Sequence, residues 1–346
     1  MVRHWWLILI ACWSFSLSAD EVTDLYESRI EVATQSRDDR QDALREAFSS
    51  VLIKVSGQRD VLERPEVSRQ LSQATNYLVQ YSYVTERQQL YLRAQFDEQR
   101  IEELLRRANA SYWSARRPNI IFWIAQETQR GARLIGRDAD SEIVPAMRRQ
   151  AHQRGLPISF PLLDLTDLSN LSASDVWGRF ERPVQEASRR YPSDGLVMVR
   201  VQEGDNGQGY LAQWTLIVGN TRRSGQVDTE DLNGIGMAVV DSVTDRVAAE
   251  YAVSYSETEA SEFTIRIINL QDLESVLLVE SLLRRLASVE QATLARYHQG
   301  TAEFRLQLIG DMRRALQALE LDNRMQRVED PWSVTASPVL EYRWLR

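Results

Sequence analysis

The sequence predicts a mixed α/β (α+β) protein made of three small sheet-plus-helix domains in series. Three observations lead to this prediction. The chain has 346 residues, which at about 100–200 residues per domain suggests two or three domains. Short runs of strand-forming residues alternate along the chain with stretches whose apolar residues recur at helical spacing. A hairpin signal at residues 191–219 lies between two helical patterns, at about 174–190 and 231–251.

The hairpin is the clearest local signal. Two apolar runs, Gly195–Val201 and Tyr210–Val218, flank the turn sequence Gly-Asp-Asn-Gly at residues 204–207. These turn residues tolerate positive φ, which a tight hairpin requires. The first run is almost wholly apolar, so we expect it inside a sheet that is covered on both faces. A sheet with helices packed on it is therefore predicted at the heart of the molecule.

The first nineteen residues have the layout of a secretory signal peptide. A basic start precedes an apolar run over residues 5–15, and the predicted cleavage lies between Ala19 and Asp20. The run is shorter than the roughly 20 residues of a membrane span, so we predict a periplasmic protein with no transmembrane segment in the mature chain. Residues 9–12 (Leu-Ile-Ala-Cys) resemble a lipobox. A lipid anchor at Cys12 is therefore the alternative to soluble release, which we prefer because the apolar run continues past Cys12.

Composition argues against some classes of function. The formal net charge is −8, and loss of the one arginine in the predicted signal peptide leaves 40 basic against 49 acidic residues, or −9. A chain this acidic lacks the positive surface that tracks phosphates, so no nucleic-acid partner is expected. Cys12 is the only cysteine, so the predicted mature chain has no disulfide, thiolate metal ligand or cysteine nucleophile.

The first predicted domain, residues 20–116, has the order β-α-α-β-β-α. Its expected elements are a strand at 25–33, a helix from Ser36 to Gly57, a short helix from Pro65, strands at 79–85 and 89–96, and a helix capped by Asp97. The pairs Arg106-Arg107 and Arg116-Arg117 are interpreted as solvated helix ends and linker rather than a ligand clamp.

The middle predicted domain, residues 117–255, surrounds the hairpin. Its other expected elements are a strand at 119–125, a Gly- and Arg-rich loop at 129–140, a helix from Ser141 to Gly155, a short strand at 157–160, a polar loop at 164–175, a third hairpin strand at 222–227 and a helix capped by Asp231. The three aspartates of the 164–175 loop match no Ca²⁺ loop, so we expect them to bond to nearby backbone instead of a cation.

The third predicted domain, residues 256–346, has the order β-α-β-β-α-β of the ferredoxin-like motif. Its expected elements are a strand at 263–268, a helix at 272–287, a hairpin of 289–297 and 301–308, a helix capped by Asp311 and a strand at 340–344.

The sequence contains no recognisable catalytic set. His152 and His298, the histidines of the predicted mature chain, are not in a metal-ligand spacing. There is no nucleophile elbow, P-loop or complete dinucleotide fingerprint. We therefore predict no catalytic, cofactor-binding or metal-binding residue, no cofactor, and a protein that is not an enzyme. Trp113, Trp123 and Trp214 are predicted core residues, and Trp332 is a candidate contact residue in a loop.

Several segments together carry a family resemblance over residues 25–255. They are residues 43–44 (Ala-Leu), 51–57 (Val-Leu-Ile-Lys-Val-Ser-Gly), 81–83, 90–97, 104–105 (Leu-Leu), Trp113, Arg117-Pro118, Trp123, 193–197 (Ser-Asp-Gly-Leu-Val), 214–216 (Trp-Thr-Leu) and 236–251. This order resembles an uncharacterised family of exported proteobacterial proteins, known only as domain of unknown function twenty sixty-six, which implies no activity. The element order of the first two domains is also similar to that of envelope assembly proteins, such as flagellar T-type proteins and the curli secretion lipoprotein. That similarity is an analogy of fold.

Three hypotheses for function follow. The first is a non-enzymatic periplasmic accessory or assembly protein of the cell envelope that binds envelope proteins. The second is a periplasmic small-molecule or peptide-binding module, with its ligand between the first and middle domains near residues 131–140 and 164–175. The third is a hydrolase whose site is assembled from residues distant in sequence.

Overall fold

A computed structural model describes residues 22–204, 207–219, 221–254, 261–286, 288–309, 312–322, 324–328 and 340–345. The expected cleavage between Ala19 and Asp20, the lipid on Cys12, the helix cap Asp311 and the loop residue Trp332 all lie outside the described residues. The described residues form a mixed α/β protein with several sheets and helices packed on them, which confirms the predicted fold class. Within these ranges, every helix is too short or too polar to span a bilayer.

The first unit runs from β1 to α3 and contains an antiparallel sheet in the order β1-β3-β2. Its elements are β1 (Glu27–Glu31), α1 (Arg37–Ser56), a 3-10 turn (Arg59–Glu63), α2 (Pro65–Ser68), a 3-10 segment (Leu71–Asn76), β2 (Leu78–Glu86), β3 (Gln89–Phe96) and α3 (Glu98–Arg107). The α1 helix begins where predicted, because the Ser36 side chain accepts a hydrogen bond from the Asp39 N–H. It ends at Gly57, whose φ of +74° favours glycine.

The middle unit runs from β5 to α8 around a six-stranded sheet, with the path β10-β9-β8-β5-β6 and β7 paired to β5. Its elements are β5 (Ile120–Thr128), β6 (Gly131–Ile135), α4 (Ile143–Arg154), β7 (Ile158–Ser159), α5 (Leu165–Asn170), α6 (Ala173–Trp177), α7 (Glu181–Ser188), β8 (Gly195–Glu203), β9 (Tyr210–Val218), β10 (Thr221–Thr229) and α8 (Leu232–Tyr251). The predicted hairpin is confirmed, since β8 and β9 pair from Gly195–Val218 to Glu203–Tyr210.

Two predicted loops of the middle unit are wrong. The Gly- and Arg-rich segment 129–140 contains β6, which forms an antiparallel hairpin with an extended β5. Strand β5 continues to Thr128, beyond the apolar run that predicted it, because backbone pairing rather than side-chain burial determines its end. The polar segment 164–175 contains α5 and α6. Asp164 and Ser172 cap these short helices, and Asp and Ser side chains bond to the backbone at helix starts as well as in turns.

The middle sheet is covered on both faces, as the apolar run in β8 predicts. Val197, Val199 and Val201 of this strand join the core beneath α4 and α8. Leu196 and Met198 point the other way, into a smaller core shared with the cap of short helices α5–α7. Alternate residues of a strand point to opposite faces, so one strand supplies both cores. The predicted core tryptophans Trp113, Trp123 and Trp214 are all buried.

The third unit runs from β12 to β16, and its ferredoxin-like arrangement is not confirmed. Its elements are β12 (Ser261–Ile268), α9 (Leu273–Arg284), β13 (Val289–His298), β14 (Thr301–Leu308), α10 (Met312–Glu320), β15 (Met325–Arg327) and β16 (Leu340–Trp344). The sheet order is β13-β14-β12-β16-β15. Strand β15 is an addition that the sequence did not predict. The last strand, β16, pairs parallel with β12 and antiparallel with β15.

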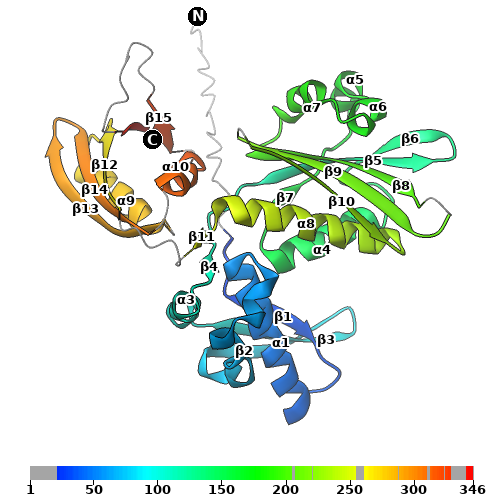
Figure 1. The fold of residues 1–346 in the computed structure, drawn as a ribbon, viewed down its shortest axis with the longest axis horizontal. Helices are drawn as coiled ribbons and strands as arrows, with labels where there is room; N and C mark the ends of the chain where they lie inside the picture. Colours follow the sequence, from blue (N-terminus) through cyan, green and yellow to red (C-terminus); the bar gives the residue numbers. More distant parts are fainter. Residues whose placement is uncertain are drawn as a thin grey trace, which may run out of the picture.

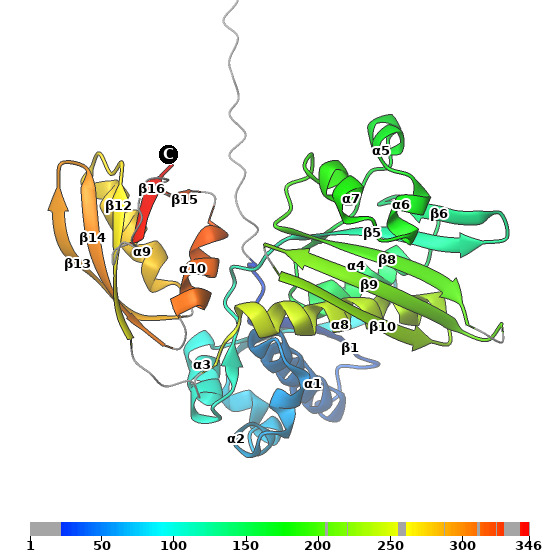
Figure 2. The same ribbon diagram turned by 45° about the horizontal axis from the view of Figure 1, so that its top comes forward.

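The three units are arranged around α8 (Figure 1). This helix lies between the middle sheet and the first unit, and its far end approaches α10 of the third unit. A view turned by 45° also places α5–α7 on the side of the middle sheet away from the first unit (Figure 2). The short strands β4 (Ser111–Tyr112) and β11 (Val253–Ser254) pair where the units meet. The limits of the three domains stay a prediction.

Candidate functional site at the junction of the units

The linker residues Arg116 and Arg117 lie where the units meet. The interpretation of this pair as solvated linker is wrong. Arg117 is only 2% exposed. Arg116 forms an ion pair with the buried Asp322 of the third unit, with 2.8 Å between Nη2 of the arginine and Oδ2 of the aspartate. Arg106 and Arg107, by contrast, are exposed at the end of α3, as expected. Two adjacent arginines therefore contact different parts of the molecule.

All five N–H donors of Arg117 are used, and every acceptor is a backbone carbonyl oxygen. The acceptors belong to Lys54 (2.7 Å), Trp113 (2.8 Å), Ser114 (2.9 Å), Gly155 (2.9 Å) and Arg154 (3.1 Å). The guanidinium also lies 4.0 Å from the ring centroid of Trp113, a cation–π contact. A planar fork of five donors can satisfy this many carbonyls at once, whereas an ammonium group cannot.

Three of the five carbonyls that Arg117 binds lie at the C-terminal ends of two helices. Lys54 belongs to the last turn of α1, and Arg154 and Gly155 end α4. These carbonyls carry partial negative charge and have no partner within their own helix, so a cation suits them. A Cβ on Gly155 would lie 2.6 Å from Arg117 Nη1 and 2.8 Å from Lys54 Cγ, so glycine permits this approach. Arg117 thereby joins the first unit to the middle unit.

Arg154 makes the second connection between these units. Its Nη1 donates to Asp241 of α8 at 2.7 Å, and its Nη2 donates to Asp245 at 2.6 Å and to the Gly57 carbonyl at 3.0 Å. Asp241 also pairs with Arg59 of the first unit. The arginine is buried and has two carboxylate partners, which is the condition under which a buried cation is tolerated.

Lys54, the only lysine in the chain, is the third buried cation. Its Nζ donates to the carbonyl oxygens of Glu27 at 2.9 Å and Asp24 at 3.1 Å, with the Asp24 carboxylate 3.8 Å away. Burial lowers the pKa of Lys54, and the nearby Asp24 carboxylate opposes that shift. Burial likewise lowers the pKa of Arg117 and of Arg154. The donors of this cluster are directed at the protein's own backbone and carboxylates, so its role is to hold the units together.

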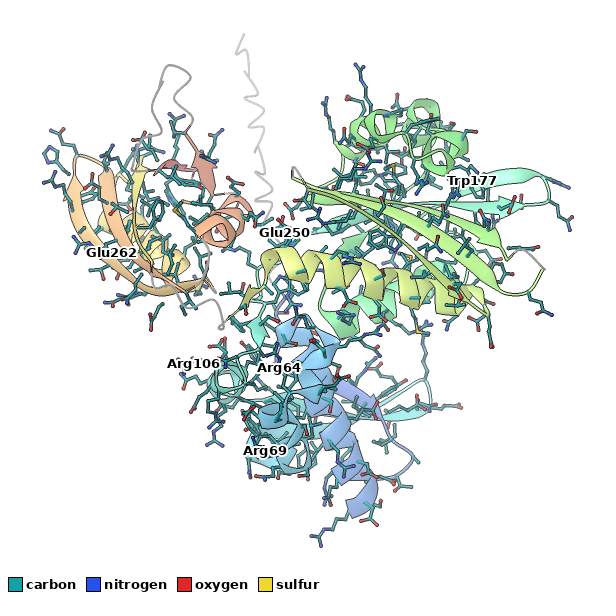
Figure 3. The ribbon with its side chains drawn as sticks, viewed as in Figure 1. Arg64, Arg69, Arg106, Trp177, Glu250 and Glu262 are labelled. Carbon is teal, nitrogen blue, oxygen red and sulfur yellow. The ribbon has the colours of Figure 1, made fainter. Side chains whose placement is uncertain are left out.

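A groove of about 400 Å³ lies beside the junction, between α3 and the third unit. Its charged lining residues are Glu98, Glu102, Arg106, Arg116, Arg284, Arg285 and Glu290. Figure 3 shows Arg106 on α3. The lining residues that the structure describes include the hydroxyl group of Ser114 and no histidine. Its volume is that of a small-ligand pocket, and such pockets occur at domain interfaces.

Tyr112 lines this groove, and its hydroxyl contacts that of a second tyrosine, Tyr26. The Tyr26 hydroxyl donates to Glu102 at 3.0 Å and lies 3.3 Å from the Tyr112 hydroxyl. Burial, together with the neighbouring carboxylates, strongly raises the pKa of both phenols. Burial and the charge of Glu102 also raise the pKa of Glu98. The groove therefore combines a protonated phenol with charges of both signs on both sides: α3 supplies Glu98, Glu102 and Arg106, and the third unit supplies Arg284, Arg285 and Glu290.

The three aspartates of segment 164–175 bond to the protein, as expected. Asp164 and Asp175 accept hydrogen bonds from the backbone at the starts of α5 and α6. Asp167 is buried and accepts from the Leu163 N–H at 2.9 Å and from the Tyr191 hydroxyl at 2.5 Å. The hydrogen bonds from Arg190 lower the pKa of Asp164 to about 2. Along the described parts of the chain, no group of three or more His, Cys, Asp and Glu side chains is placed to hold a metal ion.

The predicted ligand position between the first and middle domains is wrong. Segments 129–140 and 164–175 do lie close together, since β6 contacts α6. The residues just before the second segment also contact the first: the Arg137 N–H donates to the Pro161 carbonyl at 2.8 Å, and Gly136 faces Leu163. However, this region belongs to the cap side of the middle sheet, away from the first unit (Figure 2). The first unit contacts the opposite side through α4. Sequence periodicity shows that a sheet has two covered faces but not which neighbour covers each face.

The two histidines are not brought together. His152 is exposed near the end of α4, with its Nε2 3.4 Å from the Asp24 carboxylate. His298 ends β13, next to the left-handed turn residues Gln299 and Gly300. They lie in different units and share no site.

Comparison with known proteins identifies two uncharacterised regions. Residues 19–114 match a domain of unknown function, DUF8605, and a second family matches residues 261–345. This second family is DUF2066, whose model matches residues 261–345. The expected family is therefore present, but its match covers the third unit and not the segments over 25–255 that suggested it. No curated protein and no solved structure matches the chain.

Sequence reasoning missed the burial of Lys54, Arg117 and Arg154. Arg117 and Arg154 stand in or beside stretches of arginines and polar residues, and cations of all three kinds are usually solvent-exposed. The available signals were weak. Arg117 follows Trp113 by four residues and precedes a proline, and Lys54 lies among the apolar residues that end α1.

Proposed function

We propose that this protein is exported to the periplasm and acts there as a non-enzymatic accessory or assembly protein of the cell envelope, by binding other proteins. The observation that supports this proposal is the cap of helices α5–α7 with the residues that lead into it, which exposes large apolar side chains. These are Leu162, Leu165, Leu168 and Phe180, with Leu165 88% exposed. Several exposed large apolar residues on one small structural element are typical of a protein-contact surface.

The chemistry of the junction also favours binding over catalysis. Arg117 and Lys54 are bonded to backbone carbonyls, and Arg154 to carboxylates and a carbonyl. Such groups position parts of the protein, and they leave little capacity to bind a reacting molecule. A rigidly joined pair of units that presents an apolar cap is a suitable scaffold for a partner protein.

Site-specific photo-crosslinking in cells tests this function. A tagged, exported copy would carry the crosslinker at position 165 on the cap or, as the matched control, at position 273 on α9, where Leu273 is 70% exposed. We expect position 165 to capture a reproducible set of envelope proteins that position 273 does not capture. The same set should be lost in a Phe180→Asp variant. Capture that is equal at both positions, or absent at position 165, contradicts the proposal.

Export is tested separately by the intact mass of the protein recovered from the periplasmic fraction. A mass that begins at Asp20 supports cleavage after Ala19 and soluble release. A mass that corresponds to a lipidated Cys12 replaces soluble release with a membrane anchor, and retention of residues 1–19 in the cytoplasm contradicts export.

The groove beside α3 favours a second candidate, a small-molecule or peptide-binding module. Its arginines and glutamates would suit a ligand with both acidic and basic groups, such as a short peptide. A thermal-shift screen tests this, since a ligand at about 100 Kd stabilises a protein by about 2.7 kcal/mol. A ligand-induced rise in melting temperature that disappears in the Arg285→Ala variant supports binding in the groove. No rise across peptide and metabolite libraries argues against this second candidate.

A further inference from the structure

The outer edge of β10 differs from the other sheet edges of the molecule. It is nine residues long, and its pairing with β9 runs without a register shift from Thr221–Val218 to Thr229–Tyr210. Among the described residues, no strand pairs with its other side. Such an edge presents a row of backbone donors and acceptors that can pair with another strand.

The remaining edges are blunted. Strands β1 and β6 have five residues each, and β15 has three. The long edges β2 and β13 contain register shifts, one in β2 and two in β13. Short edge strands and bulges are the usual means by which proteins prevent edge-to-edge pairing. The edge of β10 has neither.

The charge pattern of β10 is complementary to itself. Its sequence is Thr-Arg-Arg-Ser-Gly-Gln-Val-Asp-Thr over residues 221–229. If two copies pair antiparallel about a two-fold axis at Gly225, Arg222 of one copy lies opposite Asp228 of the other, and the symmetry produces this pair twice. Directly opposed residues share a face of the sheet, so these side chains can meet. Both side chains are exposed.

Other two-fold registers lack this match within β10. The axis must pass midway between the two copies of one residue, because opposed residues share a face of the sheet. A shift of the axis to Ser224 places Arg222 opposite Gln226. A shift to Gln226 places Arg223 opposite Thr229, and it places Arg222 opposite Glu230, which lies beyond the end of β10. Arg222 already pairs with Glu181 of α7 at 2.6 Å, but its side chain remains 61% exposed and can take a second carboxylate.

We propose that the β10 edge is a homodimer interface, in which two copies of this chain join their middle sheets into one continuous antiparallel sheet centred on Gly225. Backbone hydrogen bonds supply the attraction and the two Arg222–Asp228 pairs select the register. The exposed side chains of this edge are mostly polar. Pairing therefore buries little apolar surface, and we expect a weak dimer that forms reversibly with protein concentration. The cap α5–α7 is a separate surface and stays available to a different partner.

Sedimentation equilibrium of the exported, purified protein tests this inference. We expect a reversible monomer–dimer equilibrium. Asp228→Arg places arginine opposite arginine twice and should weaken the dimer by about tenfold or more. Arg222→Asp should do the same, and the double variant Arg222→Asp/Asp228→Arg should restore the native affinity because it exchanges the charges. A native protein that stays monomeric at all concentrations, or a double variant as weak as the single ones, overturns the proposal.

Disulfide trapping gives a second measurement that does not depend on the strength of the charge pairs. In the proposed register, Ser224 of one copy faces Gln226 of the other. A mixture of Ser224→Cys and Gln226→Cys chains should form disulfide-linked dimers under mild oxidation. Mixtures of Ser224→Cys with Thr229→Cys, which are not opposed, should form far fewer. Equal yields from the two mixtures contradict the register.

Discussion

The two connections of the middle unit differ in how they are made. Its connection to the first unit contains Arg117 and Arg154, both buried and bonded to helix ends and carboxylates. Among the described residues its connection to the third unit has fewer polar contacts: Glu250 at the end of α8 accepts a hydrogen bond from Gln317 of α10 at 3.2 Å, and Arg116 of the linker pairs with Asp322. Figure 3 shows Glu250 at the end of α8 that is nearest to α10.

The difference between these connections has an energetic meaning. A buried cation that loses its partners leaves desolvated groups unpaired, so such a bridge is costly to break. The hydrogen bond between Gln317 and Glu250 is only partly buried and contributes less, because water can replace either partner. In the part of the chain that the structure describes, the third unit therefore has one charged contact of this kind, between Arg116 and the buried Asp322, and we conclude that it is attached less firmly than the first unit.

The largest effect is expected from Arg117→Met, which keeps the length of the side chain but removes all five donors. The carbonyls of Lys54 and Arg154 then lose their partners in a buried site. We expect a loss of about 3–5 kcal/mol in the free energy of unfolding, measured by urea denaturation. The matched control is Arg106→Met on the exposed end of α3. This substitution should change the free energy of unfolding by less than about 0.5 kcal/mol. Equal effects of the two substitutions would contradict the role of Arg117 as the link between the units.

A smaller decrease in the free energy of unfolding is expected from Arg154→Met. Asp241 keeps Arg59 and Gln150 as partners, and Asp245 is partly solvated, so fewer groups are left unpaired. We expect the free energy of unfolding, measured by urea denaturation, to fall by about 2–4 kcal/mol. A double-mutant cycle with Asp241→Asn should give a coupling energy of at least about 0.5 kcal/mol. Strict additivity of the two substitutions would show that the ion pair between Arg154 and Asp241 does not contribute to stability.

The attachment of the third unit should respond to acid. Burial by itself raises the pKa of Asp322, but the hydrogen bonds from Arg324 and the charge of Arg116 outweigh it, so the net pKa lies below the usual value. A lowered carboxyl pKa stabilises the folded state above the unfolded pKa of about 3.9, and this stabilisation is lost as the pH falls through the folded pKa. We expect the radius of gyration, measured by X-ray scattering, to stay constant from about pH 7 to pH 5 and to rise below about pH 4.

Asp322→Asn is the matched control for this pH effect. The variant removes the charge that Arg116 pairs with, so its radius of gyration at neutral pH should already exceed that of the native protein. An increase in acid that is identical in both proteins would assign the change to other carboxyl groups.

The smallest effect on stability is expected from Leu165→Asp in the cap. The side chain is 88% exposed, so its replacement should change the free energy of unfolding by less than about 0.5 kcal/mol. Binding of the envelope partner should nevertheless be lost. A clear loss of stability in urea denaturation would show that Leu165 supports the fold and is not a free contact residue.

The sequence predicted local structure well where one signal determines it. Ser36 and Gly57 bound α1, and the apolar runs around residues 204–207 form the hairpin β8–β9. It failed where the outcome depends on pairing between distant segments. The ladder between β5 and β6 converted a predicted loop to a strand, and the parallel pairing of β16 with β12 changed the expected ferredoxin-like sheet.

The junction was beyond sequence reasoning for a physical reason. Arg117 is buried because Lys54, Trp113 and Gly155, which are distant from one another along the chain, direct carbonyls at one point. An arginine in a linker carries no sign of this in its own neighbourhood. The predicted aspartates of segment 164–175 were easier, because each carboxylate accepts a hydrogen bond from a backbone N–H three or four residues away.

The most direct test of the central claim, that Arg117 joins the first and middle units into one body, is hydrogen exchange of the purified protein with and without Arg117→Met. We predict that α1 and α4 lose protection together, while the β12–β14 region of the third unit is unchanged. Loss of protection in α1 alone, with α4 as protected as in the native protein, would contradict the account.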